Sequence, residues 1–169
     1  MLDFKHSIIL EIHNEQYPST VKVSVNNELK HEKEYTAGTH KEHITFSHAY
    51  KDGDKNKLTI CFSADNEAES KHIKVMDICI NGASINLLNA VYKPVINQHW
   101  WDSLGERDRD HFTDVIHGNT GNTFGWYGDV SYVYYTVKDK ATKTKIRNAV
   151  GYDNEDDIVG KRTEWIYND

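Results

Sequence analysis

Apolar residues recur at every second position along several stretches of the chain. Ile8, Leu10 and Ile12 are the clearest example. Because successive side chains of a strand point to opposite faces, this spacing predicts strands that bury one face. The strands predicted in this way are Ser7–His13, Val21–Val25, His43–Tyr50, Leu58–Ser63, His72–Ile80 and Trp126–Val137, with the charged stretch Glu28–Glu34 as an edge strand or a loop.

One of these strands changes phase in its middle. Ile73 and Val75 lie on one face of the predicted strand, whereas Met76, Ile78 and Ile80 lie on the other. A β-bulge near Val75 and Met76 inserts one extra residue and would return all of the apolar positions to a single face. Burial of both faces is the alternative.

Polar turn signals separate the strands. They include the pair Asn26–Asn27, the stretch Lys51–Asn56 and the pair Asn81–Gly82, residue types that favour tight turns. Short strands that recur at roughly ten-residue spacings are typical of sandwiches rather than of parallel sheets. The sequence therefore predicts a mainly β protein, with an antiparallel β-sandwich or jelly roll as its fold.

One short helix is predicted between the strands His72–Ile80 and Trp126–Val137. Ser103 and Glu106 have the spacing of a capping box, in which two side chains bind the free backbone N–H groups at a helix start. Gly118 is a glycine at the position that commonly follows the last residue of a helix. We expect this helix at Leu104–His117.

The two strands around an acidic loop are predicted to form a hairpin over Leu58–Ile80. The loop is Ala64–Lys71, and the strands contain the two cysteines of the chain, Cys61 and Cys79. If the strands were antiparallel neighbours, the two thiols could face each other on the sheet. Isolated cysteines are more often small buried side chains, which favours free thiols over a disulfide.

The character of the sequence changes near its C-terminal end. Residues 1–137 hold the predicted strands, whereas Lys138–Asp169 has few apolar residues at core spacing. We expect this segment to be an extended arm that becomes ordered on a partner surface, or else one more edge strand of the same domain. The arm would be anchored by Trp165, Ile166 and Tyr167.

Charge and hydropathy exclude two classes of partner. The formal net charge is −6, whereas nucleic-acid binding needs clustered lysine and arginine. No apolar run approaches the ~20 residues of a membrane span. The first residues also lack the basic and apolar regions of a signal peptide. We expect a protein made in the cytoplasm, without nucleic-acid or membrane partners.

Histidines and acidic residues are the candidate metal ligands. Ten histidines are present, but the closest pairs, such as His40 and His43, have odd spacings that place them on opposite faces of a strand. Hard oxygen ligands crowd the acidic loop and could hold Ca²⁺, although no EF-hand register is present and a solvated loop is the alternative. These calcium candidates are Asp65, Asn66, Glu67 and Glu69.

Catalytic motifs are missing from the sequence. It contains no Gly-x-Ser-x-Gly segment, no phosphate-binding loop and no context for a catalytic cysteine. The sequence therefore predicts a binding protein rather than an enzyme, without a cofactor.

Aromatic residues form the most suggestive clusters. Trp100 and Trp101 follow Tyr92, and Trp126 and Tyr127 stand in a glycine-rich turn. Large aromatics in the loops of a β-sandwich can stack on sugar rings or fill a pocket on a partner, and the alternative is a lid over the core. We expect Trp126 and Tyr127 to close the core and the tryptophan pair to be more exposed. All five are candidate binding residues.

Two known groups share these patterns. The Leu58–Ile80 hairpin and the following Asn81–Ile85 resemble the terminal strands of jelly-roll carbohydrate-binding modules. The order of Ser7–Val137 is also similar to small virion-associated proteins of tailed phages, marine and cyanobacterial ones above all. There the hairpin is followed by a Tyr-x-Pro segment, here Tyr92–Pro94, and by a turn into an aromatic strand, here Asn122–Tyr135.

The resemblance implies a binding function with other virion proteins as partners. Our first hypothesis is a non-enzymatic virion structural protein, either a capsid decoration or part of the tail or fibre, that docks through its C-terminal arm. The alternative is a carbohydrate-binding module that recognises glycans of the host surface. Self-association into a homo-oligomer is left open.

Overall fold

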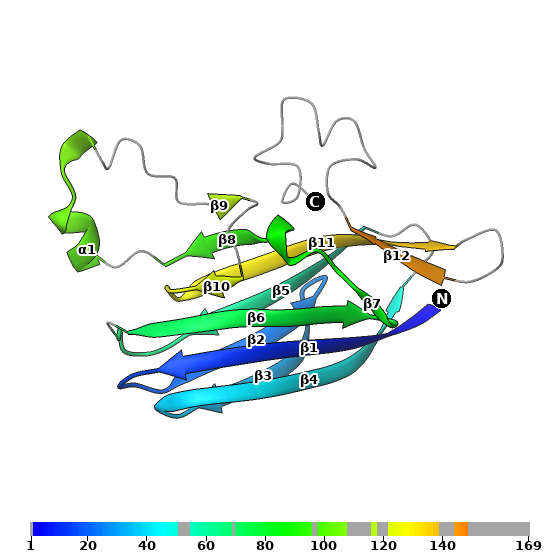
Figure 1. Cartoon of the computed structure of the whole chain (residues 1–169), viewed down its shortest axis with the longest axis horizontal. Coiled ribbons are helices and arrows are strands. Elements are labelled where there is room, and N and C mark those ends of the chain that lie inside the picture. The colour runs from blue at the N-terminus through cyan, green and yellow to red at the C-terminus, as the bar shows by residue number, and fades with distance from the viewer. Residues whose placement is uncertain are drawn as a thin grey trace.

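Two antiparallel sheets pack face to face in the computed structural model, as the sequence predicts (Figure 1). The structure describes residues 2–50, 55–68, 70–95, 98–107, 116–117, 122–138 and 144–148. The first sheet, called the β1 sheet, has the order β10 (Thr123–Phe124), β6 (Lys71–Ile80), β1 (Leu2–Asn14) and β4 (Gly38–Tyr50), with β7 (Ala83–Ser84) paired to β6.

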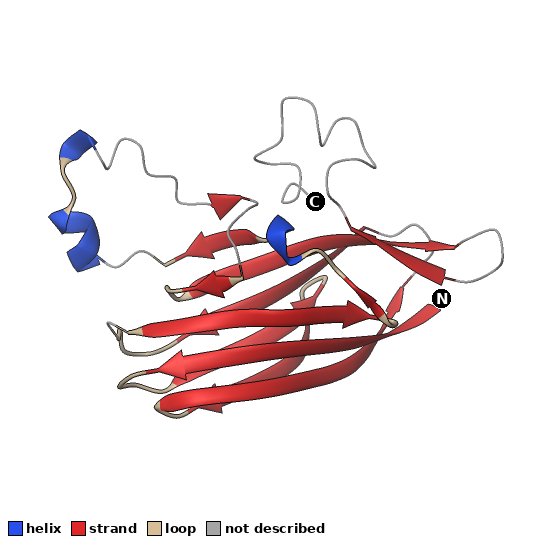
Figure 2. Cartoon of the chain, in the orientation of Figure 1, coloured by secondary structure: helices blue, strands red, loops and turns tan. Residues whose placement is uncertain are grey.

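The second sheet, called the β5 sheet, has the order β3 (Glu28–Tyr35), β2 (Ser19–Val25), β5 (Lys55–Ser63), β11 (Gly128–Lys138), β8 (Val91–Pro94) and β9 (Ile116–His117), with β12 (Thr144–Asn148) paired to β11. The described helical structure consists of a 3₁₀ turn, η1 (Leu87–Asn89), of α1 (Gln98–Ser103) and of the helical backbone at Glu106 and Arg107 (Figure 2). None of the described helices is long and apolar enough to cross a membrane.

The core lies between the two sheets and is built from the alternating positions. Ile8, Leu10 and Ile12 of β1 are fully buried, as are Leu58 and Ile60 of β5. Burying one such side chain contributes roughly 1.5–3 kcal/mol. The period of two therefore predicted the buried face of both strands.

A bulge in β6 restores a single buried face, as the phase change predicts. Ile9 of β1 pairs with Asp77, and its neighbour Leu10 pairs with Val75, so that Met76 is the extra residue. Met76 is 42% exposed, so its side chain does not belong to the buried face of β6. The bulge lets Ile73 and Ile78, which have opposite phase, both face the core.

The turn between β2 and β3 is anchored to β5. Asn26 and Asn27 have φ of 51° and 68°, the left-handed backbone that a two-residue hairpin turn of this kind needs. The Asn26 amide donates to Asn56 Oδ1 at 2.9 Å, and its side-chain oxygen accepts from the backbone N–H of Lys57 at 2.9 Å. The charged stretch after the turn forms the edge strand β3 rather than a loop.

The predicted hairpin over Leu58–Ile80 is wrong. β5 pairs with β2 and β11, whereas β6 pairs with β1, β10 and β7 of the other sheet. The acidic loop therefore crosses from one sheet to the other. Cys61 and Cys79 lie in different sheets and are both free thiols. Each strand shows one buried face, but that pattern does not say which strands are neighbours.

The predicted helix at Leu104–His117 is wrong at its C-terminal end. The helix α1 ends at Ser103, and Ile116–His117 forms β9, which pairs with β8. Within the described part of the predicted span, only Glu106 and Arg107 have helical backbone, and residues 108–115 lie outside the described residues. Ile116 and His117 pair with Tyr92 and Val91 of β8, and the cap signals at Ser103, Glu106 and Gly118 carry no information on this pairing.

Part of the predicted C-terminal arm pairs with the sandwich. Thr144–Asn148 forms β12, which is antiparallel to β11. The predicted anchor residues Trp165, Ile166 and Tyr167 lie outside the described residues. The boundary at residue 137 stays a prediction.

Gly128, where β11 pairs with β8, is predicted to be essential for the stability of the fold. Its φ is +149°, and a Cβ added there would lie 2.2 Å from the carbonyl oxygen of Lys93. Backbone strain and overpacking together should make Gly128→Ala lower the free energy of unfolding by roughly 2–4 kcal/mol in urea denaturation. Gly125→Ala is the matched control, because its Cβ meets open space. Equal urea midpoints for the two variants would contradict this account.

Candidate functional site

One end of the sandwich brings together segments that are far apart in the sequence. The crossing loop after β5, the end of β8 and the turn between β10 and β11 all lie at the end where β6 begins (Figure 1). We call these segments, residues 64–68, 92–95 and 124–127 together with Lys71, the aromatic rim. The rim joins the predicted acidic loop to three of the predicted aromatic residues.

A buried tyrosine holds the turn that presents Trp126. The Tyr92 hydroxyl donates to the carbonyl oxygen of Trp126 at 2.7 Å and accepts from its N–H at 3.0 Å. The Tyr92 ring packs against Phe124 with centroids 4.9 Å apart. Burial raises the pKa of Tyr92 to about 12, so the hydroxyl keeps its proton at ordinary pH. The backbone of Trp126 is therefore fixed at both of its polar groups.

Tyr127 closes the core beside Trp126. Its ring is 8% exposed and lies against Phe62, with centroids 4.9 Å apart. The Lys71 ammonium lies 4.9 Å from the centroid of the same ring and donates to the carbonyl oxygen of Ala68 at 2.6 Å. Burial lowers the pKa of Lys71, and the charge of Glu67 opposes that change. Lys71 thus fastens the acidic loop to the aromatic turn.

The acidic loop does not assemble a metal site in the described residues. Asp65, Asn66 and Glu67 are exposed, and Glu69 lies outside the described residues. No group of three histidine, cysteine, aspartate or glutamate side chains in the described ranges is placed to hold a metal ion. The charge of Glu67 instead acts on Lys71, where it opposes the lowering of the pKa by burial.

The predicted aromatic residues fall into different places. Tyr92 and Tyr127 are buried, which gives them a supporting role, whereas Trp126 is half-buried at the surface of the core. Trp101 is half-buried on α1, which stands beyond the end of β8 (Figure 1). Trp100 lies on the same helix, and its side chain is outside the described part of the chain.

A polar cavity on the same end of the sandwich was not predicted. It has a volume of about 480 Å³ and lies at the connection between β3 and β4. Lys33, Tyr35, His40 and Glu42 are among its lining residues. The sequence predicted only an edge strand or a loop at Glu28–Glu34. The signal that could have found the cavity wall is the two-residue spacing of Lys33 and Tyr35, which puts them on one face of β3.

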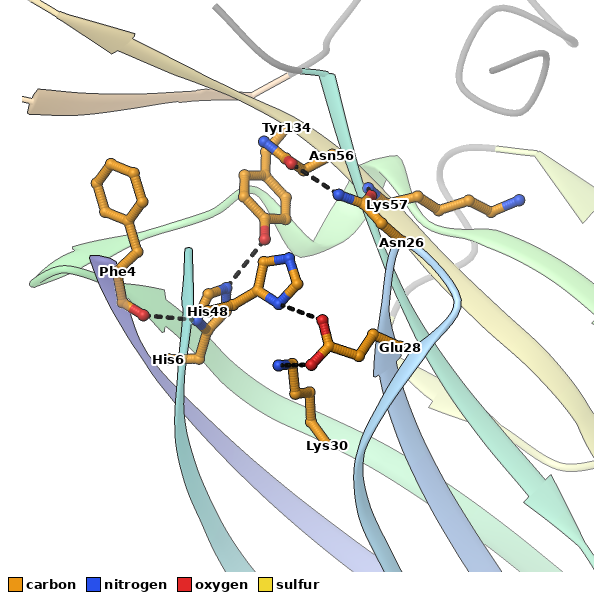
Figure 3. A network of polar contacts seen from close by, with 9 residues as sticks. All are labelled: Phe4, His6, Asn26, Glu28, Lys30, His48, Asn56, Lys57 and Tyr134. Atoms are coloured by element: carbon orange, nitrogen blue, oxygen red, sulfur yellow. Dashed lines mark hydrogen bonds and ion pairs between the residues drawn. The ribbon is translucent and has the colours of Figure 1, made fainter. Parts of the chain in front are cut away.

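The opposite end of the sandwich contains a buried polar network (Figure 3). His6 of β1 is 1% exposed, and its ring stacks on Phe46 with centroids 4.6 Å apart. Its Nδ1 lies 3.2 Å from the carbonyl oxygen of Phe4 and must donate, so Nε2 accepts from the Tyr134 hydroxyl at 2.9 Å. This bond joins the two sheets. Burial lowers the pKa of His6 to about 4.

Ion pairs continue this network to the edge of the sandwich. His48 Nδ1 of β4 lies 3.4 Å from the carboxylate of Glu28 on β3, and Lys30 pairs with the same carboxylate. The contact of His48 with Glu28 also crosses from one sheet to the other, whereas Lys30 and Glu28 lie on the same strand. The network therefore contributes to holding the sheets together, and it lies at the end opposite to the aromatic rim.

Comparisons with known proteins give a likeness in structure alone. No family model and no curated protein matches the sequence. The solved structure of vCBM60 in complex with galactobiose is similar with a TM-score of 0.44 and 15% identity, covering 75% of this chain and 95% of that chain.

A second solved structure is the selenomethionine form of vCBM60, described with a circular permutation that links two families of calcium-dependent carbohydrate-binding modules. It has a TM-score of 0.48 and 13% identity, and covers 84% of this chain and 99% of that chain. Neither likeness carries a ligand or a residue role to this chain, so function is argued from the rim itself.

The buried His6 predicts that stability falls in mild acid. The pKa of His6 is 6.5 in the unfolded chain and about 4 in the folded one, so the unfolded chain binds the proton first as the pH falls. The free energy of unfolding should decrease between pH 6.5 and 4, by about 3 kcal/mol from this group. Burial also lowers the pKa values of His31 and His48, which act in the same direction.

Urea denaturation at several pH values checks this prediction. His6→Gln removes the titrating ring and should flatten the pH dependence over this window. Tyr134→Phe is the control, since it removes the bond between the sheets but leaves a buried His6 that still titrates. The same pH dependence in His6→Gln and in the unmodified protein would refute the assignment.

Proposed function

We propose that this protein is a non-catalytic carbohydrate-binding β-sandwich, and that sugar rings stack on Trp126 at the aromatic rim. The observation that carries the proposal is the fixed turn, in which the Tyr92 hydroxyl binds both backbone polar groups of the half-buried Trp126. A large aromatic ring that is already ordered loses little conformational freedom when it binds a ligand. Stacking on the apolar face of a sugar needs such a surface.

Polar side chains around the turn suit the edges of a sugar. Asp65 and Asn66 of the acidic loop are exposed, and so is Lys93 at the end of β8. Carboxylate and amide oxygens accept hydrogen bonds from sugar hydroxyls, and the ammonium donates them. With a net charge of −6 on the chain, a neutral glycan is favoured over an anionic one.

The virion role inferred from the sequence stays a prediction. Its docking segment, with Trp165, Ile166 and Tyr167, lies outside the described residues. A protein that binds glycans on a sandwich rim can also be part of a particle, because the two functions use different segments. Sugar binding is the function for which the described residues supply an argument.

Loss of the Trp126 ring should abolish most of the binding. A glycan array identifies a ligand for the intact protein, and calorimetry then measures its affinity. Trp126→Ala should weaken binding by about 30-fold, which is the ~2 kcal/mol of a central aromatic contact. Trp101→Ala is the matched tryptophan control on α1 and should retain the affinity. The assays are run with calcium and with a chelator, which measures any metal contribution of the acidic loop.

Two results would refute the proposal. One is the absence of any glycan ligand for the folded protein. The other is an unchanged affinity in Trp126→Ala. If Trp101→Ala were the variant that lost binding, the ligand would instead bind at α1, where the sequence first suggested it.

The Tyr92 hydroxyl should matter for binding although it is buried. Tyr92→Phe keeps the ring against Phe124 but leaves the N–H and carbonyl of Trp126 without this partner. We expect the free energy of unfolding to fall by about 1–3 kcal/mol and the affinity for the glycan to fall as well, because the turn is less ordered before binding. Calorimetry on the folded variant measures this, and an unchanged affinity would show that the clamp is only structural.

A further inference from the structure

The open side of the sandwich is lined with polar side chains where β3 connects to β4. β3 and β4 are edge strands of opposite sheets, and their facing positions include Lys33 and Tyr35 from β3 and His40 and Glu42 from β4. At the connection between the strands these residues surround a cavity of about 480 Å³. That volume lies within the ~300–1,000 Å³ range of small-molecule sites.

The charges of this cavity cancel. Lys33 Nζ lies 2.8 Å from Glu42 Oε2, and the remaining two charged lining residues, Glu34 and Lys41, are also of opposite sign. The bond from Lys33 lowers the pKa of Glu42, which keeps that carboxylate ionised. The ammonium retains further donors and the carboxylate further lone pairs. A ligand with both donors and acceptors but no net charge matches this set.

Two rings form a corner of the cavity, and the backbone holds them in place. Tyr35 and His40 lie with centroids 5.6 Å apart at an angle of 53°. His40 Nε2 donates to the carbonyl oxygen of Thr36 at 2.9 Å. The amide of Asn14 donates to the carbonyl oxygens of Tyr35 and Thr36, each at 3.2 Å. Tyr35 is only 2% exposed and lies under the Lys33 ammonium, which is 5.2 Å from the ring centroid, so it supports the cavity from the core. The half-buried His40 therefore supplies the ring surface beside the hydrogen-bonding groups.

The cavity and the aromatic rim belong to one end of the sandwich. Asn14, which holds the wall of the cavity, ends β1, and the next residue, Glu15, donates its N–H to the carbonyl oxygen of Ser70 in the crossing loop at 3.1 Å. The connection from β1 to β2 therefore lies between the two places. A glycan chain that extends along this end would meet both of them.

We propose that the cavity at Lys33, Tyr35, His40 and Glu42 is a second sugar site, which takes one neutral pyranose unit. The Lys33–Glu42 pair binds neighbouring hydroxyls, and the ring of His40, which the buried Tyr35 supports, contacts the C–H face of the sugar ring. The choice of ligand class rests on the proposed function, but the location does not. Two sites on one end raise the avidity for a long glycan without new contacts at either site.

Backbone NMR shifts on the full chain test this inference, with methyl glycosides of glucose, galactose and xylose as probes. Saturable shifts are expected at residues 33–42 in the unmodified protein and in Trp126→Ala. Glu42→Gln should weaken this binding at least tenfold. Glu32→Gln is the matched control, since Glu32 lies on the same edge strand but pairs with Lys22 at the solvent-facing surface, and it should retain the shifts.

Each pattern of shifts leads to a different conclusion. Shifts confined to the aromatic rim would overturn the second site and leave the proposed function in place. Shifts confined to residues 33–42 would support the second site while refuting stacking on Trp126. Absence of shifts at both places would overturn both proposals. The mapping on the unmodified protein decides between these outcomes even if Glu42→Gln fails to fold.

Discussion

The burial of one face of each sheet against the other determines where every other feature of this protein lies. The inner faces are filled by aliphatic side chains such as Ile8, Leu10 and Ile60, which are fully buried. Polar groups can therefore collect only at the two ends of the sandwich, along its open edges and on its outer faces. The aromatic rim, the His6 network and the β3–β4 cavity are each found at one of these boundaries.

At the aromatic rim the core and the candidate surface are parts of one structure. The ring of Tyr92 packs on Phe124, while its hydroxyl fixes the backbone of Trp126. Tyr127 and Lys71 join the same turn to the crossing loop. Packing in the interior thereby orders a surface ring, which reduces the entropy that ligand binding would otherwise cost.

At the open edge of the sandwich, between β3 and β4, charged side chains replace the apolar core. Charged side chains gather here because the edge remains in contact with water, as the largely exposed side chains of Lys33 and Glu28 show. Lys33 pairs with Glu42 and Lys30 pairs with Glu28, so charge is balanced one to one at each place, and burial lowers the pKa of His48 beside Glu28, which favours its neutral form. The same pairing that makes a polar edge tolerable also leaves a neutral cavity with donors and acceptors, which is the chemistry of a sugar site.

The sequence by itself determined the long strands and their buried faces, because alternation is a property of neighbouring residues. For His72–Ile80 it left a bulge or burial of both faces open, and the pairing with β1 decided for the bulge at Met76. It also placed Tyr92, Trp126 and Tyr127 among five aromatic candidates with Trp100 and Trp101, but it did not group those three together. Only the tertiary structure decided that Leu58–Ser63 and His72–Ile80 belong to different sheets, and that Ile116–His117 is a strand. The β3–β4 cavity arose in the same way, since its residues become a site only when two edge strands face each other. Such pairings depend on contacts between distant segments, which a local pattern of apolar and polar residues does not encode.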